Sequence, residues 1–316
     1  MKLGVIGAGY VGLVTAACFS EFGYKVTCID SDKKKINKLK KNIIPIYEPG
    51  LSDLVKKNSS SNYLKFSSDI KSIVDADIIF IAVGTPTARR GNGEADLKFV
   101  YEVCKQIAKL LKKGKEKLII TKSTVPVGTG RQVEAIMRQL RPDAEFDVSS
   151  NPEFLREGAA INDFMRPDRV VIGVSSERAK EVMRELYRPL FLRETPIVFT
   201  DLETSELIKY AANTFLATKI TFINEISNLC EKVGANVNDV SIGIGLDGRI
   251  GKKFLHPGPG YGGSCFPKDT LALVKTAQDH KSPLGLIENV VESNDKRKRS
   301  MHKRILNSIG KRKKKV

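Results

Sequence analysis

The sequence predicts an α/β protein: a doubly wound parallel sheet over residues 1–200, followed by a helical domain at 201–295 and a basic tail at 296–316. Over the first of these segments, short apolar runs alternate with amphipathic stretches, as a parallel sheet covered by helices on both faces requires. The pattern then changes, because residues 204–233 contain neither Pro nor Gly and keep apolar residues at helical spacing. We therefore expect one long helix that ends at Gly234 and forms the spine of the second domain.

The individual elements follow from the same patterns, and no internal repeat interrupts them. Short apolar runs predict strands at 3–6, 26–29, 78–83, 118–121, 148–150, 170–173 and 197–199. Amphipathic spacing predicts helices between them at 11–22, 32–40, 97–111, 131–140 and 177–186. After the long helix, a loop rich in Gly and Pro at 256–267 is followed by helices at 270–278 and 284–309.

The composition is that of a folded chain with a positive net charge. The 316 residues are 41% hydrophobic, and 53 Lys and Arg against 36 Asp and Glu give a formal charge of +17. This hydrophobic content excludes disorder for most of the chain. Apolar runs such as residues 78–83 are strand-sized and far shorter than the ~20 residues of a membrane-spanning helix. No signal-peptide cleavage pattern follows the start, so a soluble, cytoplasmic protein is expected.

Most of the excess charge lies in the basic tail. Residues 296–316 hold eleven Lys and Arg and no acid, so the rest of the chain carries only +6. Such a run is typical either of a patch that binds nucleic acid or a membrane surface, or of a solvated helix face followed by a linker. The second interpretation is favoured, because no aromatic residues are interleaved for base stacking. Neither nucleic acid nor a membrane is an expected partner.

The five cysteines predict neither a disulfide framework nor a metal site. They are odd in number, widely spaced and form no Cys-x-x-Cys pair. Four of them lie in apolar segments, where cysteine packs as a small hydrophobe. Cys265 is different, because glycines surround it.

A glycine-rich turn predicts a dinucleotide site after the first strand. In the segment GAGYVG, Gly7 allows the tight turn, Gly9 lets the backbone approach a pyrophosphate, and Gly12 permits close packing of helix on strand. Asp30, at the end of the second strand, can accept from both ribose hydroxyls and repel a 2′-phosphate, which favours NAD over NADP. Lys35 either flanks the same ribose or is a solvated surface lysine.

Three further segments follow predicted strands, at the edge where open α/β sheets bind ligands. Residues 83–87 and 122–126 could equally be plain strand-ending turns. Residues 151–158 place Glu153 and Glu157 four apart, so a helical turn there would put both carboxylates on one face as an acid and base pair. The alternative is a solvated helix start.

The loop at 258–269 gives the strongest chemical signal. Its glycines supply no packing wall for Cys265 and let a substrate approach the backbone. Lys268 and Asp269 are close enough in sequence to tune or deprotonate the thiol. A covalent nucleophile is therefore favoured over a structural thiol.

Together these segments resemble the UDP-glucose/GDP-mannose dehydrogenase family. The resemblance rests on GAGYVGL at residue 7, VGTP at 83, KSTVPVGT at 122, NPEFLREG at 151, KYAANTFLA at 209, GLDGRIGKKFL at 245 and PGPGYGGSCFPKD at 257. It implies a Rossmann-like domain for NAD. It also implies oxidation of a sugar-nucleotide C6 alcohol to a carboxylate in two NAD-dependent steps, through a Cys-linked thiohemiacetal and thioester.

The resemblance also implies site residues. The implied catalytic residues are Cys265 as nucleophile, Lys209 and Asn213 at the reacting oxygen, Asp269 orienting water or the thiol, and Thr124, Glu153 and Glu157 handling water and protons. The implied NAD contacts are Gly7, Gly9, Tyr10, Val11, Gly12, Asp30, Lys35, Thr85, Thr124 and Glu157. The implied substrate contacts are Glu153, Phe154, Leu155, Arg156, Glu157, Lys209, Asn213, Arg249 (reaching a neighbouring subunit), Phe254, Leu255, His256, Pro257, Gly258, Gly262 and Lys268.

The same resemblance frames the choice of substrate and partner. The segments NPEFLREG and DGRIGKKFL favour UDP-glucose, with GDP-mannose as the alternative substrate and a non-catalytic NAD-binding or interaction module as the alternative function. Family members continue into a second Rossmann-like domain that closes over the nucleotide, so residues 296–316 are expected to lead toward it and turnover by this chain is expected to be impaired. A homodimer through the 204–233 helix is expected.

Overall fold

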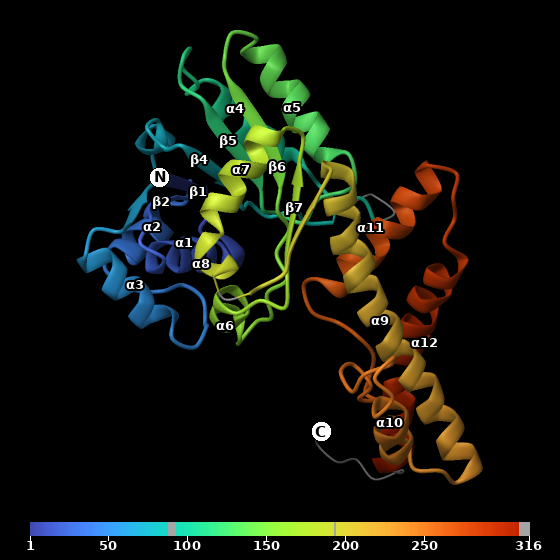
Figure 1. Cartoon of the computed structure of the whole chain (residues 1–316). Coiled ribbons are helices and arrows are strands. Elements are labelled where there is room, and N and C mark those ends of the chain that lie inside the picture. The colour runs from blue at the N-terminus through green and yellow to red at the C-terminus, as the bar shows by residue number, and fades with distance from the viewer. Residues whose placement is uncertain (88–92, 193, 310–316) are drawn as a thin grey trace. The chain divides into compact units, whose positions relative to one another are not determined.

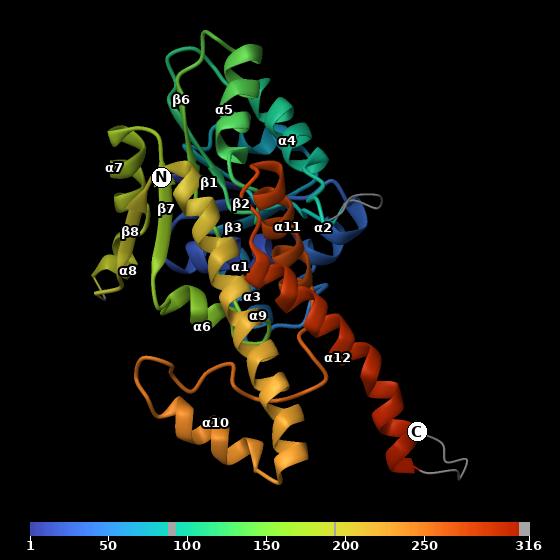
Figure 2. The same cartoon turned by 90° about the vertical axis from the view of Figure 1, so that its right-hand side faces the viewer.

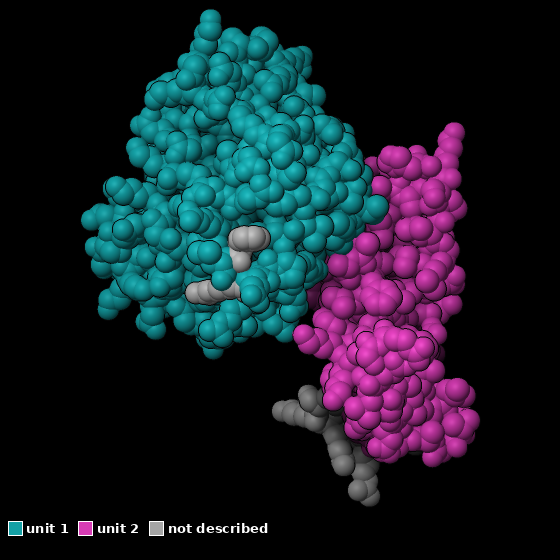
Figure 3. Space-filling model, viewed as in Figure 1, with its two compact units in different colours: residues 1–86, 95–209 teal, residues 87–94, 210–316 magenta. Residues whose placement is uncertain are grey.

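The computed structural model describes residues 1–87, 93–192 and 194–309 (Figure 1). The chain divides into two compact units (Figure 3). Unit 1 comprises Met1–Pro86 and Ala95–Lys209, and unit 2 comprises Thr87–Glu94 and Tyr210–Val316. Over the described residues, no helix combines the length and the apolar character needed to cross a membrane.

Unit 1 is built on a sheet of eight strands in the order β3-β2-β1-β4-β5-β6-β7-β8. Its strands are β1 (Lys2–Ile6), β2 (Lys25–Ile29), β3 (Leu64–Ser67), β4 (Ile78–Ile81), β5 (Lys117–Thr121), β6 (Phe146–Ser150), β7 (Val170–Val174) and β8 (Ile197–Thr200). All seven predicted strands occur. The edge strand β3 was not predicted, because four residues that alternate between buried and more exposed positions give too short a pattern.

Helices cover both faces of this sheet. They are α1 (Tyr10–Glu21), α2 (Lys33–Lys40), α3 (Leu51–Ser60), a 3₁₀ turn (Ile70–Ile73), α4 (Lys98–Ala108), α5 (Thr129–Leu140), α6 (Ala160–Met165), α7 (Glu177–Leu186) and α8 (Arg188–Phe191). One core lies between the sheet and α1, α2, α3, α6 and α7, and the other lies against α4 and α5. In β1, Leu3 and Val5 point into the first core and Ile6 into the second, so the sheet is buried on both sides, as its continuous apolar strands predict.

The doubly wound α/β class is confirmed, with one departure in strand direction. The sheet was predicted to be parallel throughout, but β7 runs antiparallel to β6, while β7 and β8 are parallel to each other. Between β6 and β7 the chain forms only the six-residue helix α6. A parallel pair needs a full crossover connection, whereas antiparallel neighbours do not.

The long helix α9 (Leu202–Val233) begins in unit 1 and continues into unit 2 as one uninterrupted element (Figure 2). Unit 2 also contains α10 (Val237–Gly245), α11 (Phe266–Asp279) and α12 (Gly285–Ile309). The three predicted helices are confirmed. Helix α10 was not predicted, because two glycines weaken its helical pattern. Residues 296–309 of the basic tail lie within α12, and residues 310–316 lie outside the described residues.

Candidate active site

The carboxyl ends of β1, β2, β4, β5 and β6 meet at one edge of the sheet, because these strands are parallel. Three of the predicted loops leave that edge, and the structure joins two of them directly. The hydroxyl of Thr85 donates a hydrogen bond of 2.8 Å to the backbone oxygen of Thr124, and Ser123 donates one of 2.7 Å to the backbone oxygen of Val83. The two loops therefore form one connected surface rather than independent turns.

The glycine-rich turn leaves space at the start of α1. Gly7 has a φ of +107°, and a Cβ there would lie 2.4 Å from the backbone oxygen of Ala82. A Cβ at Gly12 would lie 1.8 Å from the backbone oxygen of Gly7, so the helix packs on the turn at a distance that only glycine permits. Gly9 is the N-cap of α1, and no heavy atom comes within 4 Å of where its Cβ would be. This geometry fits a pyrophosphate against the helix N-terminus.

Asp30 is held beside this turn by three hydrogen bonds. It accepts from the backbone nitrogens of Ala8 and Asp32, each at 2.9 Å, and from Lys35 Nζ at 2.8 Å. Burial alone would raise the pKa of Asp30, but the Lys35 and backbone hydrogen bonds outweigh it and leave the pKa below its ordinary value. The carboxylate is thus ionised at neutral pH, as an acceptor for a ribose diol must be. Lys35 pairs with the predicted ribose-binding acid instead of extending into solvent.

The loop after β6 is not helical, so the helical turn that would have put Glu153 and Glu157 on one face is absent. Residues 151–156 form no helix and 157–159 form a turn. Glu153 is buried and its Oε2 accepts from the backbone nitrogen of Leu155 at 2.6 Å, whereas Glu157 is exposed. Pro152 has no N–H to donate to a helical hydrogen bond. The bond from the Leu155 backbone to the Glu153 side chain also competes with helix formation. The two carboxylates therefore occupy different environments.

Asn151 anchors the start of that loop. Its Nδ2 donates to the backbone oxygen of Val171 at 2.8 Å, and its Oδ1 accepts from Lys122 Nζ at 2.9 Å and from Tyr187 Oη at 2.5 Å. Burial lowers the pKa of Lys122 to about 8. A buried lysine is therefore bound to the first residue of the loop that carries Glu153.

Lys209 on α9 forms a buried ion pair with Glu153. The Nζ to Oε1 distance is 3.1 Å, and the side chains are 5% and 8% exposed. Two cations lie over the Phe154 ring, with Lys209 Nζ 5.0 Å and Arg169 Cζ 3.6 Å from its centre. Arg156, by contrast, pairs with Asp163 at 2.5 Å at the surface, and Leu155 is half-buried.

In unit 2, the predicted nucleophile lies at the start of a helix. Cys265 is exposed and is the N-cap of α11, where its backbone oxygen accepts from the nitrogen of Asp269 at 2.8 Å. Its Sγ lies 3.6 Å from Ser264 Oγ. The other four cysteines are buried, as predicted, and burial raises the pKa of Cys28 and of Cys104 to about 12. Cys265 is therefore the accessible thiol of the described residues.

Asp269 is the most buried acid near this cysteine, with a side chain 1% exposed. Its Oδ2 accepts from Asn213 Nδ2 at 2.6 Å and its Oδ1 from Lys268 Nζ at 2.5 Å. Both oxygens of Asp269 are therefore engaged by side chains other than the thiol that it was predicted to tune.

The predicted substrate segment at 249–262 is irregular and partly strained. Phe254 has a φ of +66°, a conformation that costs energy for a non-glycine residue and is found at functional sites. Leu255 is buried, Pro257 and Gly258 are half-buried, and His256 and Gly262 are exposed. Arg249 is 90% exposed at its side chain and pairs with Asp247 of its own loop at 2.6 Å.

Several polar residues of the site were missed from the sequence. Glu48 accepts from the backbone nitrogens of Gly158 at 2.8 Å and Ala160 at 2.9 Å and from the hydroxyl of Tyr10, so it ties the glycine-rich turn to the loop after β6. Glu206 accepts from the backbone nitrogens of Gly128 and Gly130 at the start of α5. These acids lie 110 and 78 positions from the partners they bind, so no local pattern could reveal them.

A doubly wound sheet with this glycine-rich turn and an acid at the end of its second strand, joined to a helical unit with an accessible cysteine, defines a dinucleotide-binding oxidoreductase. Residues 1–191 match the NAD binding domain of the UDP-glucose/GDP-mannose dehydrogenase family, and residues 203–296 match the central domain of that family. The chain belongs to this family.

Individual relatives agree with this assignment. The UDP-glucose 6-dehydrogenase of Rhizobium meliloti is 62% identical over 313 residues, which are 98% of this chain and 71% of the relative. The UDP-glucose 6-dehydrogenase TuaD of Bacillus subtilis is 52% identical over 98% of this chain and 66% of its own length. The solved UDP-glucose dehydrogenase of Pyrobaculum islandicum superposes with a TM-score of 0.89 at 37% identity, over 93% of this chain and 68% of that one.

Proposed function

We propose that this chain catalyses the NAD-dependent oxidation of the C6 alcohol of UDP-glucose to the carboxylate of UDP-glucuronate, with Cys265 as the nucleophile. The similarity to relatives of that activity supports the substrate. The observation that carries the chemistry is a pair of buried contacts on α9: Lys209 with Glu153, and Asn213 with Asp269. Lys209 and Asn213 are one helical turn apart and so share a helix face.

The first oxidation needs a cofactor site and a group that holds the alcohol. The space at Gly9 and the ionised Asp30 fit NAD, which when bound accepts a hydride from the substrate carbon in each of the two oxidations. In the proposal, the Lys209 ammonium and the Asn213 amide donate to the C6 oxygen. Glu153 takes up, through water, the proton that this oxygen loses.

The second oxidation proceeds on Cys265. Its sulfur adds to the aldehyde carbon to form a thiohemiacetal, whose oxidation gives a thioester. Water then attacks the carbonyl carbon, the C–S bond breaks, and the thiol and the carboxylate are released. Asp269, fixed by Asn213 and Lys268, orients that water. The balance is one alcohol, one water and two NAD consumed, and one carboxylate, two NADH and three protons formed.

The test measures NADH formed per UDP-glucose by the wild-type chain, Cys265→Ser and the matched control Cys230→Ser. We expect two NADH per sugar nucleotide in the wild type and in the control, and at most one, from the first oxidation alone, in Cys265→Ser. Titration with NAD alone checks the cofactor site independently. If the wild-type chain binds NAD but forms no NADH, the proposal is contradicted and a non-catalytic module is favoured. Faster turnover of GDP-mannose than of UDP-glucose would assign the alternative substrate.

We also propose that α9 joins two copies of the chain. Phe215, Phe222 and Leu229 are 65%, 49% and 56% exposed. Their spacing of seven residues puts them on one side of the helix, which is how apolar residues line helix pairs. The same arrangement would give the exposed Arg249 a neighbouring subunit to reach, as the family resemblance implies.

A further inference from the structure

The loop that leads to Cys265 is held by side chains of α9 and α12. We infer that Asn224, Asn294 and Arg297 are positioning residues that fix this loop and, through it, the place of the cysteine. The inference rests on the proposed function for its kinetic consequence, whereas the hold on the loop can be measured without any turnover.

Four hydrogen bonds from these three side chains fix the backbone of the loop. The backbone nitrogen of Gly258 donates to Asn224 Oδ1 at 2.7 Å, and Arg297 Nε donates to the oxygen of Gly258 at 2.9 Å. Asn294 binds both sides of Tyr261: its Oδ1 accepts from the nitrogen at 2.8 Å and its Nδ2 donates to the oxygen at 3.1 Å. The backbone N–H and C=O groups of both Gly258 and Tyr261 are therefore hydrogen-bonded to side chains of α9 and α12.

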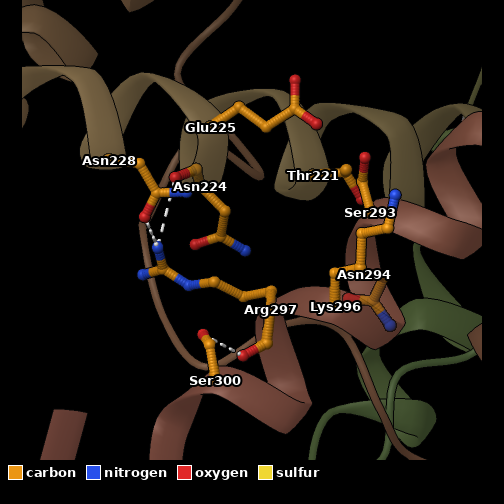
Figure 4. Close-up of a pocket in the computed structure, with 9 residues that line it drawn as sticks. All are labelled: Thr221, Asn224, Glu225, Asn228, Ser293, Asn294, Lys296, Arg297 and Ser300. Carbon is orange, nitrogen blue, oxygen red and sulfur yellow. Dashed lines mark hydrogen bonds between the residues drawn. The ribbon is translucent and has the colours of Figure 1, made fainter. Parts of the chain in front are cut away.

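The side chains that make these bonds are themselves fixed. Asn224 and Asn294 are each 3% exposed. Arg297 also donates to the backbone oxygen of Asn224 at 3.3 Å and to Asn228 Oδ1 at 2.5 Å, so it links the two helices. Figure 4 shows Arg297 reaching from α12 toward Asn224 and Asn228 of α9, beside a polar cavity of about 300 Å³. These bonds between α9 and α12 restrict the positions that the three side chains can take.

The loop approaches α12 too closely for a side chain. Gly260 has a φ of +121°, and a Cβ there would lie 2.7 Å from Asn294 Oδ1. Beyond it, Tyr261 is 4% exposed and its ring lies 6.3 Å from that of Phe266, the first residue of α11. Only three residues, Gly262 to Ser264, separate the fixed Tyr261 from Cys265 at the start of α11. The cysteine is thus located from both ends of the segment.

The two asparagines differ in a way that provides matched variants. Asn224 uses its amide oxygen, and its Nδ2 has no hydrogen-bond partner among the described residues. Asn294 uses both amide atoms. Substitution by Asp keeps the shape and one acceptor, removes the donor and adds a negative charge, for which Arg297 beside Asn224 is a counter-ion. Asn224→Asp should therefore retain the hold, while Asn294→Asp should set a carboxylate oxygen against the carbonyl oxygen of Tyr261.

The experiment compares backbone amide hydrogen exchange and steady-state kinetics for the wild type, Asn294→Asp, Arg297→Lys and Asn224→Asp, with thermal unfolding as a check that each folds. For Asn294→Asp we expect exchange of residues 258–269 to rise about tenfold and kcat with UDP-glucose to fall about 100-fold. The affinity for NAD should not change. Arg297→Lys, which lacks the Nε donor, should show a smaller rise in the exchange of residues 258–269. For Asn224→Asp, both the exchange and kcat should stay within about twofold of the wild-type values.

Three results would overturn the inference: unchanged exchange in Asn294→Asp, an Asn224→Asp variant as perturbed as Asn294→Asp, or a rise confined to residues 258–261 that does not extend to Cys265. A wild-type chain that forms no NADH would contradict the proposed function alone, because the exchange comparison would still decide the positioning.

Discussion

Glu206 Oε1 lies 2.7 Å from the backbone nitrogen of Gly130, and its Oε2 lies 2.7 Å from that of Gly128. The carboxylate on α9 thereby satisfies two N–H groups at the start of α5, which no intrahelical carbonyl can reach. A Cβ at Gly130 would lie 3.1 Å from Glu206 Oε1, so α5 and α9 pack closely at this point. This contact joins Lys209, three residues later on α9, to the segment that follows Thr124.

The first prediction concerns the pH dependence of stability at this contact. Burial raises the pKa of Glu206 to about 7, against the lowering effect of the Gly130 and Gly128 hydrogen bonds. Because the folded state holds this proton more tightly than the unfolded chain, the contribution of Glu206 is full below its unfolded pKa of about 4.3 and declines until pH 7. We expect the free energy of unfolding of the wild type to lose about 2–3 kcal/mol from this group across that window.

Glu206→Gln isolates the effect, because the amide cannot titrate. Denaturant unfolding at pH 5 and pH 8 measures the free energy of unfolding of both proteins. The difference between wild type and variant should change by about 2–3 kcal/mol between the two pH values, with the variant relatively more stable at pH 8. A difference that is independent of pH would show that Glu206 keeps its charge at both values.

The second prediction concerns the buried pair of Lys209 and Glu153. Lys209→Met leaves the Glu153 carboxylate buried without its counter-ion, so we expect a loss of about 3–5 kcal/mol in the free energy of unfolding at pH 7. Adding Glu153→Gln should recover most of that loss, because no charge then remains uncompensated. Denaturant unfolding of the two single variants and the double variant measures the coupling. Additive effects would contradict a direct ion pair.

Much of the fold could be predicted because burial imprints a pattern on neighbouring residues. Strands such as β4 and β5 are buried at every position, and β4 and the centre of β5 are apolar, since helices cover both faces of the sheet. Parallel strands also bring their carboxyl ends together. This rule alone placed Thr85 and Thr124 at the same edge. The reversal of β7 leaves no such pattern, because a strand buried on both faces has the same composition in either direction.

The polar contacts of the site could not be predicted in the same way. Asn294 binds Tyr261 from 33 positions away, and an asparagine in the middle of a charged amphipathic helix has the composition of a solvated face. The interpretation of residues 151–158 failed for a related reason. The spacing of Glu153 and Glu157 is compatible with a helix, but local hydrogen bonding and Pro152 decide the backbone of that loop.

The third prediction concerns cofactor choice at Asp30. Asp30→Asn removes the charge that would bind the ribose hydroxyls and that pairs with Lys35, so the affinity for NAD should fall about 10- to 100-fold. The preference for NAD over NADP should narrow, because a neutral amide no longer repels a 2′-phosphate. Calorimetric titration with each cofactor measures the two affinities and their ratio. Asp69→Asn, a surface acid that caps a 3₁₀ turn through Lys71, is the control and should leave both affinities unchanged.

The fourth prediction concerns the apolar side of α9. Phe222 lies between Phe215 and Leu229, and all three are exposed. Phe222→Asp should convert the proposed dimer into monomers, because a charge in an apolar contact between copies must be desolvated. Light scattering coupled to size exclusion measures the mass directly. Leu140→Asp changes another apolar residue, 47% exposed at the end of α5, and should leave the mass unchanged. A wild type that is monomeric at the concentrations used for turnover would contradict the proposed contact, and an unchanged dimer in Phe222→Asp would move the interface away from this side of the helix.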